Sequence, residues 1–149
     1  MIPKTPDQKD RQGWMGLLAR ATPEHLAALM PDLPPHSLLR GPEVGAVMVR
    51  GRVGGTGVPF NLGEMTVTRC TVQLTGGPAG HAHIQGRDKQ HAVRAAVIDA
   101  LMQTDRAYAL RAGVLEPLAA HETATRALRA AKAAATKVEF FTLARGEDA

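Results

Sequence analysis

Three basic side chains gather at the predicted start of a helix, in residues 85–91. Arg87, Lys89 and His91 follow one another at alternate positions, and Asp88 between them is a good N-cap residue. The first turn of a helix carries unpaired N–H groups and the positive end of the helix dipole, so it suits phosphate oxygens and disfavours cations. We therefore predict that these three side chains face an anion, which is either a ligand or a carboxylate of a partner. A capped helix start with solvated charges is the alternative.

A second basic cluster, Arg50 and Arg52, comes directly before a glycine-rich turn. Apolar and basic residues alternate over 47–53, which predicts a strand with both arginines on one face. The turn contains Gly54, Gly55, Thr56 and Gly57. Its backbone amides could approach a phosphate or the main chain of a partner. The turn lacks the lysine of a Walker loop, so an ordinary hairpin connection is the alternative.

Two histidines have a spacing that occurs in metal sites. The strand predicted over 80–85 places His81 and His83 on one face, and His91 follows in the next helix. A metal site needs a third or fourth ligand, and no carboxylate or thiolate lies beside these histidines in the sequence. We therefore predict that the chain binds no metal.

The remaining candidate side chains do not form a catalytic set. Cys70 shares a predicted strand face with Val72 and Leu74, which favours a buried thiol over a nucleophile. A basic stripe on the helix predicted over 121–137 favours a solvated face, with docking of an acidic partner as the alternative; it contains Arg126, Arg129 and Lys132. The carboxylates are scattered singly, and no Walker, Rossmann or Gly-x-Ser-x-Gly motif is present. The sequence therefore predicts one part of a larger catalyst.

Composition narrows the class of protein. The chain has 149 residues, of which 44% are hydrophobic, so it fits one folded domain. A formal net charge of +4 suits anionic ligands, whereas an aromatic content of 3% gives little stacking surface for nucleic acid. No apolar window approaches the length of a membrane span, and no charged-then-apolar signal opens the chain. A single cysteine indicates a reducing compartment, so we expect a soluble cytoplasmic protein.

The periodicity predicts an α+β fold, in two layers, with a mainly antiparallel sheet of about four to five strands. One domain over 1–149 is expected, with N-terminal helices in 1–36, antiparallel strands in 37–85, and two longer helices and a possible final strand in 86–149. Thr5 and Thr22 precede prolines as helix caps, and an apolar stripe after Asp88 predicts a helix that ends near Tyr108. Gly113 is expected to interrupt the helices. The strands are predicted over 47–53, 64–74, 80–85 and 138–143.

The ordered set of motifs resembles the PhnG family, a subunit of the bacterial carbon–phosphorus lyase system. The similar segments are 11–15, 18–21, 50–57, 63–69, 85–92, 98–103 and 138–146, which together cover nearly the whole chain. The departures are confined to 31–37, 76–79 and 110–120. His81 and His83 lie outside the family pattern, whereas Arg69 lies within it.

This resemblance implies a role beside other subunits of the system. The family acts with PhnH, PhnI and PhnL to join a phosphonate to C1 of the ribose of ATP, with release of adenine. The radical subunit PhnJ acts later on the product. We therefore expect a subunit without catalytic residues of its own and without a bound cofactor, with ATP as the co-substrate of the complex. Its candidate contacts to substrate or partners are Arg50, Arg52, Gly54, Gly55, Thr56, Gly57, Arg69, Arg87, Asp88, Lys89 and His91. A stand-alone nucleotide- or phosphate-binding enzyme that uses Arg87, Lys89 and His91 is the alternative.

Overall fold

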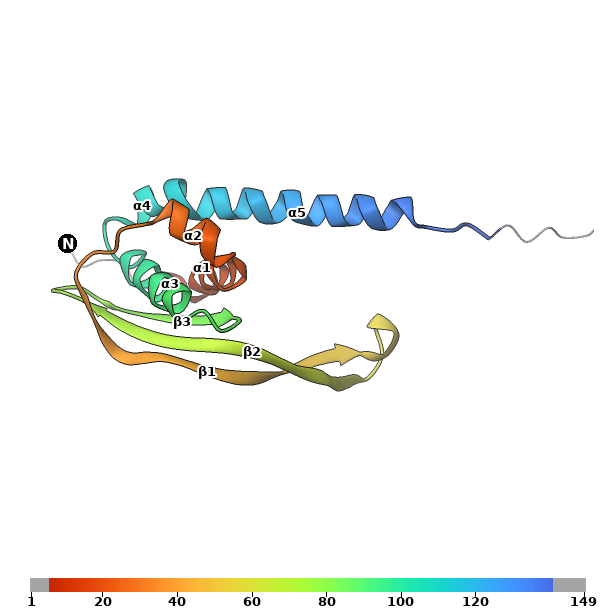
Figure 1. Cartoon of the computed structure of the whole chain (residues 1–149), viewed down its shortest axis with the longest axis horizontal. Helices are drawn as coiled ribbons and strands as arrows, with labels where there is room; N and C mark the ends of the chain where they lie inside the picture. Colours follow the sequence, from red (N-terminus) through yellow and green to blue (C-terminus); the bar gives the residue numbers. More distant parts are fainter. Residues whose placement is uncertain (1–5, 141–149) are drawn as a thin grey trace, which may run out of the picture.

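A three-stranded antiparallel sheet carries all of the helices on one of its faces (Figure 1). The computed structural model describes residues 6–140 of the chain. The strands, in the spatial order β1-β2-β3, are β1 (His36–Arg52), β2 (Pro59–Leu74) and β3 (Ala79–Gln85). The helices are α1 (Gln8–Arg20), α2 (Pro23–Leu29), α3 (Lys89–Leu101), α4 (Ala107–Leu110) and α5 (Glu116–Ala135). The predicted α+β class and antiparallel sheet are therefore confirmed.

The hairpin of β1 and β2 extends far beyond β3. The two long strands have 17 and 16 residues, whereas β3 has seven and its last pair joins Gln85 to Val67. Residues 46–66, which we call the arm, therefore have no third strand beside them. Figure 1 shows that the arm projects from the body of the molecule and that α5 projects in the same direction. The fold thus consists of a packed body and two extensions.

The body is held together where α3 crosses the sheet. Cys70 and Val72 of β2 and Ile84 of β3 are buried against α3, as alternate residues of strands with one covered face. Gly80 lies directly beneath α3, because an ideal Cβ at this position would be 2.0 Å from the carbonyl oxygen of Ala96. The absence of a side chain at Gly80 therefore sets the close approach of the helix to the sheet.

The sheet differs from the prediction in its strand count. Over residues 6–140 it has three strands rather than four or five. Strand β1 begins at His36, close to the start of the predicted strand region 37–85 but well before the individual strand predicted over 47–53. The early part of β1 lacks clear alternation because it contains Pro42 and two irregularities of register, features that an edge strand tolerates. In the predicted strand 138–143, residues 138–140 form no strand, and 141–143 lie outside the described residues.

Two helix boundaries also differ from the prediction. Helix α1 begins at Gln8, with Asp7 at the N-cap position but without a capping hydrogen bond from its side chain, and the predicted cap Thr5 lies outside the described residues. Helix α3 ends at Leu101, not near Tyr108, because the Thr104 hydroxyl and the Gln103 amide donate to carbonyls of its last turn. By contrast, the predicted cap Thr22 is confirmed, since its hydroxyl accepts a hydrogen bond from the backbone of His25.

Gly113 does not interrupt the helices as predicted. It lies in a π-helical segment, η2 (Arg111–Leu115), that joins α4 directly to α5. Val114, Leu115 and Leu118 around it are buried, and this packing outweighs the cost of about 1 kcal/mol of a glycine in a helix. Among residues 6–140, no helix is both long enough and apolar enough to cross a bilayer.

Candidate functional site

The glycine-rich turn lies at the tip of the arm. Gly54 and Gly55 have φ values of +62° and +85°, a region that residues with side chains rarely adopt. The amides of Thr56 and Gly57 both donate to the carbonyl of Val53, so these two amides are used within the turn. The glycines are thus accounted for by a tight hairpin connection, and no ligand is needed to explain them.

The arginines of the arm are exposed. Arg50 and Arg52 alternate with the less exposed Val49 and Gly51, as the pattern predicts. Arg52 donates through Nη1 to the carbonyl oxygen of Gly57 at 3.2 Å, a contact that holds it across the turn. Arg50 takes part in no ion pair with the described residues. Its guanidinium is therefore available to an anion or to a partner.

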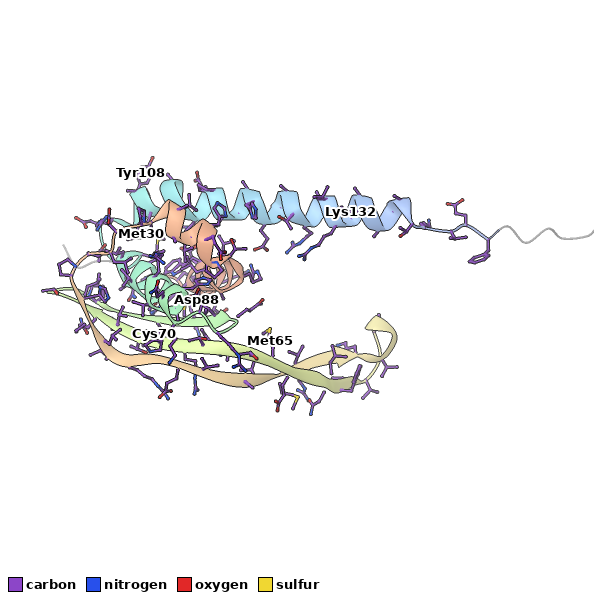
Figure 2. The ribbon with its side chains drawn as sticks, viewed as in Figure 1. Met30, Met65, Cys70, Asp88, Tyr108 and Lys132 are labelled. Carbon is purple, nitrogen blue, oxygen red and sulfur yellow. The ribbon has the colours of Figure 1, made fainter. Side chains whose placement is uncertain are left out.

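The start of α3 has the capped geometry that the sequence predicts. The carboxylate of Asp88 accepts a hydrogen bond from the backbone N–H of His91 at 2.8 Å. Arg87 and Lys89 are exposed, and neither forms an ion pair within residues 6–140. Two free cations thus remain at this helix start, which lies in the body and away from the tip of the arm (Figures 1 and 2). The structure therefore does not bring the two predicted clusters together.

The side chain of His91 does not face solvent beside Arg87 and Lys89. It is 1% exposed, and its Nε2 donates to the carbonyl oxygen of Leu18 in α1 at 2.9 Å. Burial lowers the pKa of His91, which keeps the ring neutral, and Nδ1 has no hydrogen-bond partner among the described residues. The predicted contact of this ring with an anion is inconsistent with its position, because α1 packs over it.

Arg69 lies on the sheet face opposite the helices. It is the Cα partner of Glu43 on β1 and of His83 on β3, and its Nη2 is 3.9 Å from the carboxylate of Glu43. Arg40 binds the same carboxylate at 2.8 Å, so this is a small surface charge cluster. Such exposed pairs contribute little to stability. The contacts of Arg69 are thus with the outer face of the sheet, and they connect it neither to the tip of the arm nor to the start of α3.

His81 and His83 are exposed on this same outer face. His91 lies on the other side of the sheet, within the helical layer, so the three histidines do not converge. His81 bonds instead with the hydroxyl of Thr71 at 3.1 Å. Within the described part of the chain, no three His, Cys, Asp or Glu side chains are grouped to hold a metal ion.

The buried carboxylate of Asp99 is a feature that the sequence reasoning missed. It accepts two hydrogen bonds from Arg11, at 3.1 and 2.7 Å, and one from the indole of Trp14 at 2.9 Å. It also accepts the backbone N–H of His81 at 2.9 Å. This hydrogen bonding raises the pKa of Arg11. Asp99 thus joins α1, α3 and β3, and the spacing of Arg11 and Trp14 on one helix face was its only signal in the sequence.

A cleft between α1, α2 and α5 also escaped the sequence reasoning. We call it the basic cleft; it has a volume of about 320 Å³ and is lined by Arg20, His25, His121, Glu122, Arg126 and Arg129, with Gln85 and five smaller or apolar residues. Glu122 accepts from Arg20 at 3.2 Å and from Arg126 at 2.9 Å. Neither Arg87 nor Lys89 lines it. Part of the stripe predicted to be solvated therefore lines a concave site.

Comparison with known proteins identifies the family. The family model of the phosphonate metabolism protein PhnG matches residues 9–146. A protein of Rhizobium meliloti (strain 1021), named alpha-D-ribose 1-methylphosphonate 5-triphosphate synthase subunit PhnG, is 47% identical over 141 residues, which cover 93% of this chain and 90% of the relative. These matches span the body, the arm and α5, and this chain therefore belongs to the PhnG family.

Proposed function

We propose that this chain is a subunit of an alpha-D-ribose 1-methylphosphonate 5-triphosphate synthase. The assembly would join methylphosphonate to C1 of the ribose of ATP and release adenine, as the resemblance to the family implies. The observation that carries the proposal is the 47% identity to a protein of that name along almost the whole of both chains. Similarity over this length leaves no large segment in which a different function could reside.

The geometry favours a subunit over a stand-alone enzyme. The stand-alone alternative needs Arg87, Lys89 and His91 at one site, and His91 is buried under α1. The exposed cations at the tip of the arm are remote from this helix start (Figure 1). The arginines of the arm and the cations at the start of α3 therefore do not form one site, and other subunits would be needed to complete a reaction centre.

The arm is suited to contact those other subunits. Its exposed large apolar side chains are Met48, Val53, Val58, Phe60 and Leu62. Large apolar side chains exposed close together along one segment are typical of an interaction site. Arg50 and Arg52 lie on the same arm, so we infer that the partner surface carries acidic groups as well as apolar ones. We propose that PhnI, PhnH, PhnJ or PhnL supplies this surface, in the cytoplasm.

We further propose that ATP enters as the co-substrate of the complex and that this chain holds no cofactor of its own. We also assign the two exposed cations at the start of α3, Arg87 and Lys89, to contacts with substrate or partner. The backbone N–H groups of a helix N-terminus and these two positive charges both favour a negatively charged group there.

Reconstitution tests the proposed function. The other subunits are purified with and without this chain and are incubated with ATP and methylphosphonate, and released adenine is quantified by chromatography. We expect adenine release only when the chain is present, and no turnover by the chain alone. Turnover by the chain alone, or equal turnover without it, would contradict the proposal.

The start of α3 is tested in the same assay. The double variant Arg87→Ala/Lys89→Ala is compared with Lys9→Ala/Arg106→Ala, which removes two exposed cations elsewhere on the body. We expect the first variant to lower the rate at least about tenfold, because a hydrogen bond to a charged group contributes about 1.5–3 kcal/mol. Both variants should unfold at the same temperature as the parent chain. Equal rates for the two variants would remove Arg87 and Lys89 from the site.

A further inference from the structure

Three arginines from two helices line the basic cleft. Arg20 comes from the end of α1, and Arg126 and Arg129 come from successive turns of α5. Arg20 and Glu122 are 102 residues apart in the sequence, and their 3.2 Å contact closes the cleft between α1 and α5. Tertiary packing, rather than a local motif, thus creates this concentration of arginine.

The cleft carries an excess of positive charge. Among the described residues that line the cleft, Glu122 is the one acidic residue, and it is shared between Arg20 and Arg126. Arg129 forms no ion pair within residues 6–140. Three guanidinium groups against one carboxylate leave two positive charges for a bound species to neutralise.

The other lining groups add hydrogen-bond donors that suit an oxyanion. The imidazoles of His25 and His121 lie edge to face, with 4.7 Å between their centroids, and each ring can donate an N–H. The hydroxyl of Thr125 and the amide of Gln85 also line the cleft. A volume of about 320 Å³ is at the lower end of the range of small-molecule sites. Such a site fits a compact anion.

We propose that the basic cleft binds the dianionic phosphoryl end of a small molecule, that is, a phosphate or phosphonate group. Such a group carries a charge of about −1.5 to −2 at neutral pH, which matches the excess in the cleft. Arginine forks bind its oxygens in pairs, so Arg129 and Arg126 hold two edges of the group from one helix face. Which molecule carries this group, a phosphonate or a nucleoside triphosphate, is inferred from the proposed function. The existence of the anion site does not depend on that function.

Calorimetry on the full-length chain tests the site. The chain is titrated separately with methylphosphonate, inorganic phosphate and ATP, and these three titrations distinguish the sources of the phosphoryl group. Arg129→Ala is compared with Lys132→Ala, which removes the same charge from α5 one turn further on, outside the cleft. We expect Arg129→Ala to weaken binding at least about tenfold and Lys132→Ala to leave it within about twofold.

A third variant is expected to change the affinity for the anion in the opposite direction. Glu122→Gln removes the negative charge of the carboxylate in the cleft and keeps one oxygen, which can accept from Arg20 or from Arg126 but not from both as now, so we expect anion binding to tighten several-fold. Thermal unfolding should be nearly unchanged in all three variants, since exposed ion pairs contribute little to stability. An anion held only by the general positive charge of the surface would respond equally to Arg129→Ala and to Lys132→Ala, so the difference between these two variants is what locates the anion in the cleft.

Three results would overturn the proposal. The first is no binding of any of the three anions, the second is equal weakening by Arg129→Ala and Lys132→Ala, and the third is weaker binding by Glu122→Gln. If Arg129→Ala abolishes co-purification of the other subunits while no anion binds, the cleft receives an acidic group of a partner protein. That result removes the anion site and leaves the proposed function standing. Conversely, anion binding without any need for the chain in adenine release contradicts only the proposed function.

Discussion

At the scale of single residues, Asp99 organises the body of the molecule. Its side chain is fully buried and accepts four hydrogen bonds, three of them from side chains of α1 and one from the backbone of β3. A buried carboxylate is tolerated only when its charge is paired and its oxygens are hydrogen-bonded, and Arg11, Trp14 and His81 meet both needs. The segments of the chain that resemble the PhnG family at 11–15 and 98–103 therefore meet in space.

Replacement of Asp99 should be costly. Asp99→Ala leaves Arg11 without its partner and two N–H groups without an acceptor, so we expect the free energy of unfolding to fall by about 3–5 kcal/mol. Asp10→Ala is the control, because it breaks the exposed pair of Asp10 with Arg111 and should cost less than about 1 kcal/mol. Urea unfolding measures both. Similar losses in the two variants would show that Asp99 contributes no more than a surface charge.

His91 makes the stability of the chain depend on pH. Its pKa in the fold is lowered by burial from an ordinary value of 6.5, so the unfolded chain binds more protons as the pH falls below that value. We therefore expect protonation of His91 to leave the free energy of unfolding unchanged above about pH 6.5 and to lower it as the pH falls below that value. In His91→Gln, whose amide can still donate to Leu18, this decrease from pH 7.5 to pH 5.5 should be smaller. Denaturant unfolding at the two pH values checks this, and an equal decrease in both chains would contradict it.

At the scale of elements, the contact of α3 with the sheet depends on Gly80. The carbonyl of Ala96 and the amide of Ala100 lie where a side chain at this position would begin. Backbone atoms of a helix cannot rotate away as a side chain would, so the helix and the strand must separate if Gly80 is replaced. The close packing of these two elements also covers Ile84 and Val72 of the core.

Gly80→Ala should therefore destabilise the fold. We expect a loss of about 3 kcal/mol or more, at the upper end of the cost of overpacking a core. Gly45→Ala is the matched control, because Gly45 is also in a strand and has open space where a Cβ would lie. Thermal and urea unfolding give the two values. A loss no larger for Gly80→Ala than for Gly45→Ala would mean that α3 adjusts freely.

At the scale of the whole molecule, the stable body and the projecting parts are separated. The buried residues belong to the body, whereas the arm and the far part of α5 present exposed side chains to their surroundings (Figure 2). Met65 lies on the arm, and Lys132 lies on the part of α5 that extends beyond the other helices (Figure 2). Within residues 6–140, no residue of the arm and none of α5 beyond Leu118 is buried. This division is typical of a protein that buries part of its surface against other subunits in a complex.

The apolar side chains of the arm should thus matter for assembly rather than for folding. We expect Phe60→Ser/Leu62→Ser to change the free energy of unfolding by less than about 1 kcal/mol, since Leu62 is 65% exposed, Phe60 is 42% exposed, and neither belongs to the buried core. The same variant should lose co-purification with co-expressed subunits. Tyr108→Ser is the control, because Tyr108 is 87% exposed but lies on α4, away from the arm (Figure 2). Partner binding that survives in the arm variant would place the interface elsewhere.

The sequence by itself determined the features that depend on neighbours along the chain. The cap at Thr22, the cap at Asp88, the tight turn at Gly54 and Gly55 and the buried face of Cys70 were all predictable, because each is set within a few residues. The α+β class followed from the change of periodicity, and the family followed from the order of the motifs.

Tertiary structure alone decided which side chains meet. The local pattern at the start of α3 predicted an exposed His91, but the carbonyl of Leu18 covers it from 73 residues away. Arg11 and Trp14 come to Asp99 from 88 and 85 residues away, and Arg20 and Glu122 of the basic cleft are 102 residues apart, and no periodicity encodes such a meeting. Likewise, alternation predicts that a strand has two different faces, but whether a face is covered depends on the length of its neighbours. The short β3 leaves the arm uncovered, and that is why the sequence predicted strands there but not a projecting surface.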